Sequence, residues 1–225
     1  MNPSTKRPTY AKSAHKQASK KSNNLPIIGI AIGIAVALVV AVVVIAQSGE
    51  ADSPVDTSEY GVVDVSGDAL ASFTGDGIDP AVGSAAPVLE GEDFLDEPVS
   101  VGDAGTPELV VFLAHWCPHC NAEAPRLKAY LDQAGVPDDV RITLVPTGST
   151  PTRDYWPPSQ WLDDMGLSDL PTLVDDEDAT AATAYGLDGF PYIVALDADG
   201  KVVARVSGEQ PEGYFAQVIE MLRSA

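Results

Sequence analysis

The residues of this chain whose type and spacing are best suited to catalysis are two cysteines, Cys117 and Cys120. They are the chain's only cysteines and lie in the segment Cys-Pro-His-Cys. On a helix this spacing is about one turn, so the two sulfurs can close a small disulfide ring. The Cys117 thiolate could attack a disulfide, and Cys120 could then attack the mixed intermediate. The pair predicts thiol–disulfide exchange through a redox-active Cys117–Cys120 disulfide, with no separate cofactor.

A Cys-x-x-Cys pair also occurs in zinc sites, so the supply of further ligands matters. The histidines are His15, His115 and His119, and there is no second cysteine pair. A typical zinc or copper site therefore lacks distant ligands, and we predict no metal site. A copper-binding chaperone stays open as an alternative. A thiol peroxidase is disfavoured because Pro-His-Cys follows Cys117, without the Thr-x-x-Cys pattern of peroxiredoxins.

A strand and a helix are predicted on either side of the cysteines. Residues 109–114 form an unbroken apolar run, typical of a strand that is buried on both faces. Residues 121–134 carry apolar side chains at helical spacings. The cysteines would lie at a helix N-terminus, where the helix dipole stabilises a thiolate. Pro118 suits the first helical turn, and the N–H or positive charge of His119 could stabilise the Cys117 thiolate.

The rest of the pattern predicts a mixed α/β sandwich. Strands are expected at 140–145, 191–196 and 202–206, and helices at 158–165, 179–185 and 214–223. Asp199-Gly200 is a hairpin signal between the last two strands. A parallel βαβ unit followed by an antiparallel hairpin and a closing amphipathic helix is typical of this class.

The N-terminal part differs in composition from the rest. Six Lys and Arg and no Asp or Glu lie in the first 26 residues, and residues 25–46 carry no charge. Twenty apolar helical residues span roughly 30 Å, the thickness of a bilayer core, whereas the apolar cores of signal peptides are shorter. We predict a basic cytoplasmic tail at 1–24, an uncleaved transmembrane anchor at 25–46, a tether at 47–84 and the domain at 85–225. Since Lys and Arg beside a span stay in the cytoplasm, the domain would lie outside the cytoplasm, at the cell membrane.

Acidic residues dominate the chain after this N-terminal part. Six of the 13 Lys and Arg lie in the first 26 residues, so the remainder carries seven against 33 Asp and Glu. Nucleic acid would be repelled by this charge and is excluded as a partner of the domain. The acids are best explained by solubility.

Residues 110–125 resemble the active-site strand, motif and helix of thioredoxin-like proteins. Residues 187–194 are similar to the family's segment with a cis-proline that faces the active site, and residues 82–87 resemble the entry segment of TlpA-like, redoxin-type proteins. The resemblance implies a thioredoxin-like sandwich with a central mixed sheet. It implies roles in catalysis or substrate contact for these residues: Cys117, Cys120, His119, Pro118 and Pro191 in catalysis, and Trp116 and Phe190 in substrate binding.

Two departures from the family pattern bear on the direction of electron flow. Thioredoxins place a buried acid where this chain has Val111, so proton transfer needs another group. The Pro-His dipeptide resembles that of the periplasmic oxidase DsbA, which favours an oxidase or isomerase; a TlpA-like reductase, for example in cytochrome c maturation, is the alternative. The expected partners are thiols and disulfides of exported proteins and a membrane redox partner.

Other polar and aromatic residues near the motif receive no chemical role. Glu123 and His115 are expected on the solvated surface. The aromatic cluster at 155–161 could line a substrate groove, but a packing role is favoured. The acidic run at 175–178 lacks EF-hand spacing and is predicted to be a solvated turn before a helix.

Overall fold

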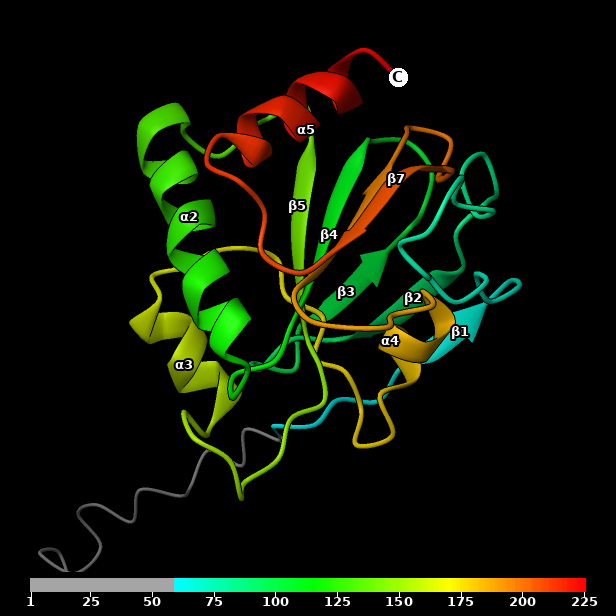
Figure 1. The fold of residues 1–225 in the computed structure, drawn as a ribbon. Coiled ribbons are helices and arrows are strands. Elements are labelled where there is room, and N and C mark those ends of the chain that lie inside the picture. Colours follow the sequence, from blue (N-terminus) through cyan, green and yellow to red (C-terminus); the bar gives the residue numbers. More distant parts are fainter. Residues whose placement is uncertain (1–58) are drawn as a thin grey trace, which may run out of the picture. The chain divides into compact units, whose positions relative to one another are not determined.

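The cysteine segment follows one strand of a four-stranded sheet in the computed structural model, which describes residues 59–225 (Figure 1). The strand order is β5-β4-β6-β7. Strand β4 (Glu108–Leu113) runs parallel to β5 (Arg141–Pro146) and antiparallel to β6 (Tyr192–Leu196), which pairs antiparallel with β7 (Val202–Ser207). The predicted central mixed sheet is confirmed.

Strand β4 is buried on both faces because its alternating side chains enter two separate cores. Leu109, Val111 and Leu113 face one core, and Val110 and Phe112 face the other. Helices α2 (Pro118–Ala134), α3 (Pro158–Asp164) and α5 (Tyr214–Arg223) supply the first core. Helix α4 (Thr180–Ala184) and the segment before β4 supply the second. Figure 1 shows α2, α3 and α5 on the side of the sheet away from α4.

A second, three-stranded antiparallel sheet was not predicted from the sequence. It consists of β1 (Asp64–Ser66), β2 (Val88–Glu92) and β3 (Pro98–Val101), in that order. These strands are short, and β1 is exposed along its length, so they carry little apolar periodicity that a sequence reading could detect.

The predicted tether at 47–84 packs onto the domain from residue 59 onward, through the scattered apolar residues that could dock there. Val63 and Leu70 are buried in the second core, and the Phe73 ring lies 5.8 Å from that of Tyr192. The partners of these residues lie far along the chain, so the sequence did not identify them. Residues 47–58, the predicted tail and the predicted anchor lie outside the described residues. None of the helices between residues 59 and 225 combines the length and the apolar character that a membrane crossing requires.

The other predicted elements are confirmed to within a few residues. The main difference concerns the helix expected at 121–134, which begins at Pro118. Cys120 therefore lies inside its first turn.

Candidate active site

Cys117 is the N-cap residue of α2, and Cys120 lies one turn further along the helix. The Cys117 N–H donates to the Ala114 carbonyl at 3.0 Å, and the Ala114 N–H donates to Cys120 Sγ at 3.4 Å. Both cysteines are free thiols. Cys117 retains 5% of its surface exposed and Cys120 none, so a reacting partner can reach only the first thiol without opening the fold. Pro118 occupies the first helical turn, as predicted.

Asn121 holds the turn that precedes the cysteines. Its Nδ2 donates to the carbonyls of His115 and Cys117, each at 2.9 Å. Its Oδ1 accepts a hydrogen bond from Nε1 of the buried Trp161 at 2.9 Å. Helix α3 thereby supports the active-site turn through one amide. This role of Asn121 was not predicted from the sequence, and only its place directly after the motif could have suggested it.

Glu123 is buried one helical turn after Cys120, and the expectation of a solvated residue is wrong. Only 1% of Glu123 is exposed, and its Oε2 accepts hydrogen bonds from Arg126 Nη1 at 2.9 Å and the Gln210 N–H at 3.0 Å. Among residues 59–225, Oε1 of Glu123 is the one buried side-chain oxygen or nitrogen without a hydrogen-bond partner. Cys120 lies three residues before Glu123, and this helical spacing places the two side chains on the same side of α2.

The pKa of Cys120 is raised well above its usual range. Burial is the main cause, the Ala114 N–H opposes it, and the nearby Cys117 and Glu123 raise the pKa further. Cys120 therefore stays a thiol until a base takes its proton. A buried carboxylate with one free oxygen can take that proton, so Glu123 supplies a group of the kind that is missing at Val111.

A chain of charged groups links this carboxylate to His119. Arg126 bridges Glu123 and Glu209, with Nη2 lying 3.0 Å from Glu209 Oε2. Nδ1 of His119, a side chain that is 65% exposed, lies 2.7 Å from Glu209 Oε1. These contacts with His119 and Arg126 lower the pKa of Glu209. One imidazole nitrogen of His119 is thus directed at a carboxylate.

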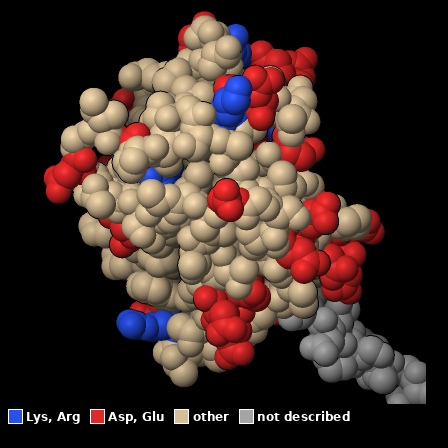
Figure 2. All heavy atoms as spheres, turned by 90° about the vertical axis from the view of Figure 1, so that its right-hand side faces the viewer, with Lys and Arg blue, Asp and Glu red and all other residues tan. Residues whose placement is uncertain are grey.

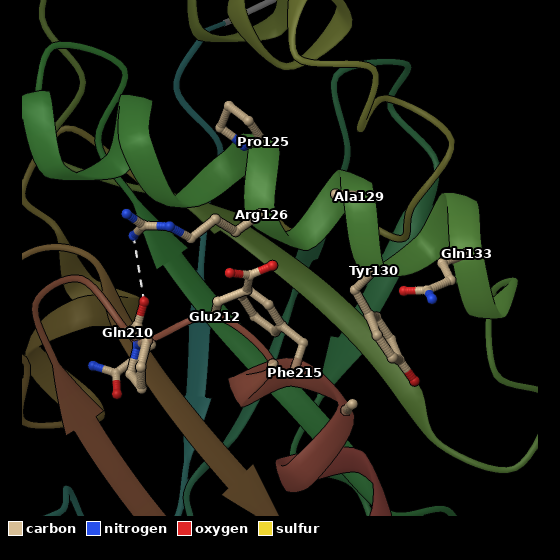
Figure 3. Close-up of a pocket in the computed structure, with 11 residues that line it drawn as sticks. Pro125, Arg126, Ala129, Tyr130, Gln133, Gln210, Glu212 and Phe215 are labelled. Atoms are coloured by element: carbon tan, nitrogen blue, oxygen red, sulfur yellow. Dashed lines mark hydrogen bonds between the residues drawn. The ribbon is translucent and has the colours of Figure 1, made fainter.

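A hollow of about 560 Å³ lies beside this chain of charges, between α2 and residues 210–216. In Figure 3, Arg126 extends along its edge toward Gln210, whose carbonyl lies 3.3 Å from Arg126 Nη1. Tyr130 and Phe215 line another part of it. The hollow therefore borders Arg126 and Gln210, the two residues that donate hydrogen bonds to Glu123, and it reaches α5 at Phe215.

Trp116 and Phe190 lie together at the rim of the site. Their rings are in edge-to-face contact, with centroids 5.8 Å apart. Trp116 Nε1 donates to the Gly148 carbonyl at 2.8 Å, and the guanidinium of Arg153 lies 5.0 Å from the Trp116 ring centre. The peptide bond between Phe190 and Pro191 is cis, as the resemblance implied. The structure therefore brings the predicted substrate-contact residues together beside the cysteines.

His115 is buried, in contrast to the surface position expected from the sequence. Its Nδ1 donates to the Asp154 carbonyl at 2.7 Å, and its Nε2 accepts from the Thr150 N–H at 3.2 Å. Burial lowers the pKa of His115, which favours the neutral ring that this pattern requires. Both ring nitrogens are occupied, so His115 is not free to bind a metal with the cysteines. Over residues 59–225, no group of three or more His, Cys, Asp or Glu is arranged to hold a metal ion.

The aromatic and acidic clusters have packing roles. Trp156 packs edge-on against His115, and Trp161 is in the core, whereas Tyr155 is exposed. Asp175 is buried rather than solvated, and it accepts hydrogen bonds from Thr147 Oγ1 at 2.6 Å and from the first turn of α4. Its place before a helix is as predicted, but its partners in the core were not.

Comparison with known proteins gives matches over this same region. A family model described as a thioredoxin-like domain matches residues 96–223. The methylamine utilization protein MauD of Paracoccus denitrificans is 29% identical over 129 residues, which are 56% of this chain and 58% of MauD. MauD of Methylophilus methylotrophus is 28% identical over 56% of each chain. The chain thus spans little more than half the length of these relatives.

Solved structures show the same fold. The thioredoxin domain of a thiol-disulfide oxidoreductase from Bacteroides vulgatus is 26% identical, with a TM-score of 0.51, and the match covers 63% of this chain and 98% of that domain. A putative thiol:disulfide interchange protein DsbE from Chlorobium tepidum is 19% identical, with a TM-score of 0.52, and the match covers 63% and 96% of the two chains. At 19% identity, the match with the Chlorobium protein shows a shared fold and nothing more.

Proposed function

The chain belongs to the thioredoxin-like domain family, and we propose that it is a thiol–disulfide oxidoreductase that reduces disulfides of exported proteins. One observation carries the proposal: a slightly exposed Cys117 caps α2 in front of a fully buried Cys120, which has the carboxylate of Glu123 beside it. The similarity to the Bacteroides thiol-disulfide oxidoreductase supports the same chemistry.

The two thiols act in sequence in this proposal. The Cys117 thiolate attacks a client disulfide, whose S–S bond breaks as a mixed disulfide forms; the released client thiolate takes a proton from water. Glu123 then accepts the proton of Cys120, and the Cys120 thiolate attacks the Cys117 sulfur. The second client thiolate leaves and takes the proton that Glu123 had accepted, so Glu123 is a carboxylate again and Cys117 and Cys120 end as a disulfide. Two electrons have passed to the client, whose two protons came from water and from Cys120, and a membrane dithiol partner restores the reduced pair.

The environment of the cysteines favours reduction over the oxidase or isomerase role that Pro-His suggested. Stabilising a thiolate stabilises the reduced form and makes the pair more oxidising. Here Nδ1 of His119 lies 2.7 Å from Glu209 Oε1, so the carboxylate of Glu209 offsets the positive charge that this imidazole could bring to the Cys117 thiolate. The alternative left open by the sequence, a TlpA-like reductase, is therefore the role we propose. No contact of the described residues favours a copper chaperone.

We place this reductase outside the cytoplasm and at the membrane. The uncharged residues 25–46 and the Lys and Arg before them support this location. Protease added to intact cells should cleave the domain if the outer membrane or wall is made permeable while the inner membrane stays closed. A domain that stays protected until that membrane is broken would refute the location without touching the redox proposal.

A glutathione redox titration of the full chain in detergent tests the direction. We expect a potential in the lower half of the range between thioredoxin, about −270 mV, and DsbA, about −120 mV. His119→Ala should change it little, because the imidazole is directed at Glu209. A potential near that of DsbA, together with a clear fall in the His119→Ala variant, would refute the reductase role and restore the oxidase.

A further inference from the structure

Arg153 differs from the other cations of the described residues. Residues 59–225 contain seven Lys and Arg, and six of them form ion pairs with Asp or Glu. These six are Arg126, Lys128, Arg141, Lys201, Arg205 and Arg223. Within this part of the chain, Arg153 is exposed and has no carboxylate at ion-pair distance; its guanidinium lies over the ring of Trp116. The unpaired cation therefore lies beside the redox site.

Residues 59–225 carry far more Asp and Glu than Lys and Arg. Figure 2 shows Asp and Glu spread over one face of the domain, with few Lys or Arg among them. An acidic segment of another protein would be repelled over most of such a surface. Arg153, a cation at the active-site rim with no carboxylate partner among the described residues, is the exception to this pattern.

The fold holds the loop of Arg153 in place from both sides. His115 accepts from the N–H of Thr150 and donates to the carbonyl of Asp154, so one buried ring fixes both ends of the turn. The Arg153 N–H donates to the Thr150 carbonyl at 3.3 Å. Trp116, which lies next to Cys117, is tied to the same loop through the Gly148 carbonyl. Two residues of the active-site segment thus position this arginine.

A guanidinium next to an indole is well suited to binding a carboxylate. The contact with the ring limits the motion of the side chain, and the planar group still presents N–H donors that can bind both oxygens of an Asp or Glu. A client cysteine that reacts with Cys117 must pass next to Trp116, so the residues beside that cysteine come within reach of Arg153.

We propose that Arg153 is a specificity-determining residue that binds an Asp or Glu flanking the reactive disulfide of a client protein. This inference rests on the proposed function, whose substrate class it narrows to disulfides in acidic segments. His115 is the positioning residue that holds the Arg153 loop.

Matched disulfide peptides test the proposal. They share one sequence and carry Asp, Ser or Lys on both sides of the reactive cysteine. The reduced full chain in detergent should react with the Asp peptide about two to five times faster, in kcat/KM, than with the Ser peptide, since one exposed ion pair is worth about a factor of this size. The Lys peptide should be slowest. Raising the salt from about 0.1 M to about 1 M, which shortens the Debye length from about 10 to about 3 Å, should remove most of the difference.

The variant Arg153→Glu should reverse the order of the peptides, and Arg153→Lys should keep a weaker preference for Asp. Lys201→Glu is the matched control, because it changes the net charge by the same amount. Lys201 lies in the turn between β6 and β7. This turn is at the end of the sheet where β4 begins, because Leu196 pairs with Glu108, the first residue of β4. The cysteines follow the last residue of β4, at the opposite end of the sheet. This control should keep the wild-type preference.

The outcomes separate the two proposals. Reduction of the Cys117–Cys120 disulfide by an uncharged phosphine, which carries no carboxylate and does not react as a thiolate, should be the same in wild type and in Arg153→Glu, which shows that the disulfide is still accessible. Exchange with all peptides but without preference, or an unchanged preference in Arg153→Glu, would overturn the role of Arg153 and leave the reductase standing. Absence of exchange with every peptide would overturn the proposed function and this inference with it.

Discussion

Replacing Asn121 with alanine should lower the free energy of unfolding by about 2–5 kcal/mol. The change leaves Trp161 Nε1 buried without an acceptor, which costs about 1–3 kcal/mol, and removes two hydrogen bonds to the carbonyls of His115 and Cys117, worth about 0.5–1.5 kcal/mol each. The higher helix propensity of alanine returns roughly 0.5 kcal/mol, and the Cys117 carbonyl keeps its bond from the Asn121 backbone N–H.

Thermal and urea unfolding of the reduced protein measure this loss. For a domain of this size, about 2–5 kcal/mol corresponds to a fall in the melting temperature of about 4–20 °C. Gln160→Ala is the matched control, because this exposed amide of α3 makes one side-chain hydrogen bond, to Asp164. It should change stability by less than about 0.5 kcal/mol.

The functional consequence is slower disulfide exchange, since the turn that positions Cys117 loses its support. Trp161→Phe separates the two effects: it removes the buried Nε1 donor and leaves both Nδ2 hydrogen bonds of Asn121 in place, so it should lower the exchange rate less than Asn121→Ala does. A melting temperature of Asn121→Ala equal to that of wild type would show that Trp161 Nε1 finds another acceptor. That result would refute the role of Asn121 as the link between α3 and the cysteine turn.

Two further perturbations follow from the buried groups of the site. Glu123→Gln should slow the decay of the mixed disulfide about 100-fold, because a general base is lost. Glu220→Gln, at an exposed position, is the control and should leave the decay rate unchanged. Rapid-quench trapping measures the decay, and equal rates in Glu123→Gln and wild type would remove Glu123 from the mechanism. Burial lowers the pKa of His115 below its value in the unfolded chain, which is about 6.5. As the pH falls below that value, the unfolded state therefore binds more protons than the folded state, and the wild-type protein should lose stability. Urea unfolding between about pH 8 and 5 should show a smaller loss for His115→Gln, and parallel curves for the two proteins would contradict the neutral buried ring.

Local patterns determined the elements that carry the chemistry. The apolar run of β4, the helical spacing after the cysteines and the Asp-Gly hairpin depend on neighbours close in sequence, and each was found within a few residues of its predicted place. Cys117 at a helix start is likewise a local feature, because a strand-to-helix junction is specified by the residues around it.

The tertiary structure alone decided what surrounds the cysteines. Glu123 and His115 are polar residues that the sequence placed in solvent, and they are buried because Arg126, Gln210, Thr150 and Asp154 supply their hydrogen bonds. Most of these partners lie more than 30 residues away, so no local pattern announces them. The sequence by itself determined that a cysteine pair begins the helix that follows a strand of a mixed sheet. The proton acceptor Glu123 and the position of Arg153 at the rim were decided by chain segments that meet only on folding, because the burial of a polar group depends on its partners and not on composition.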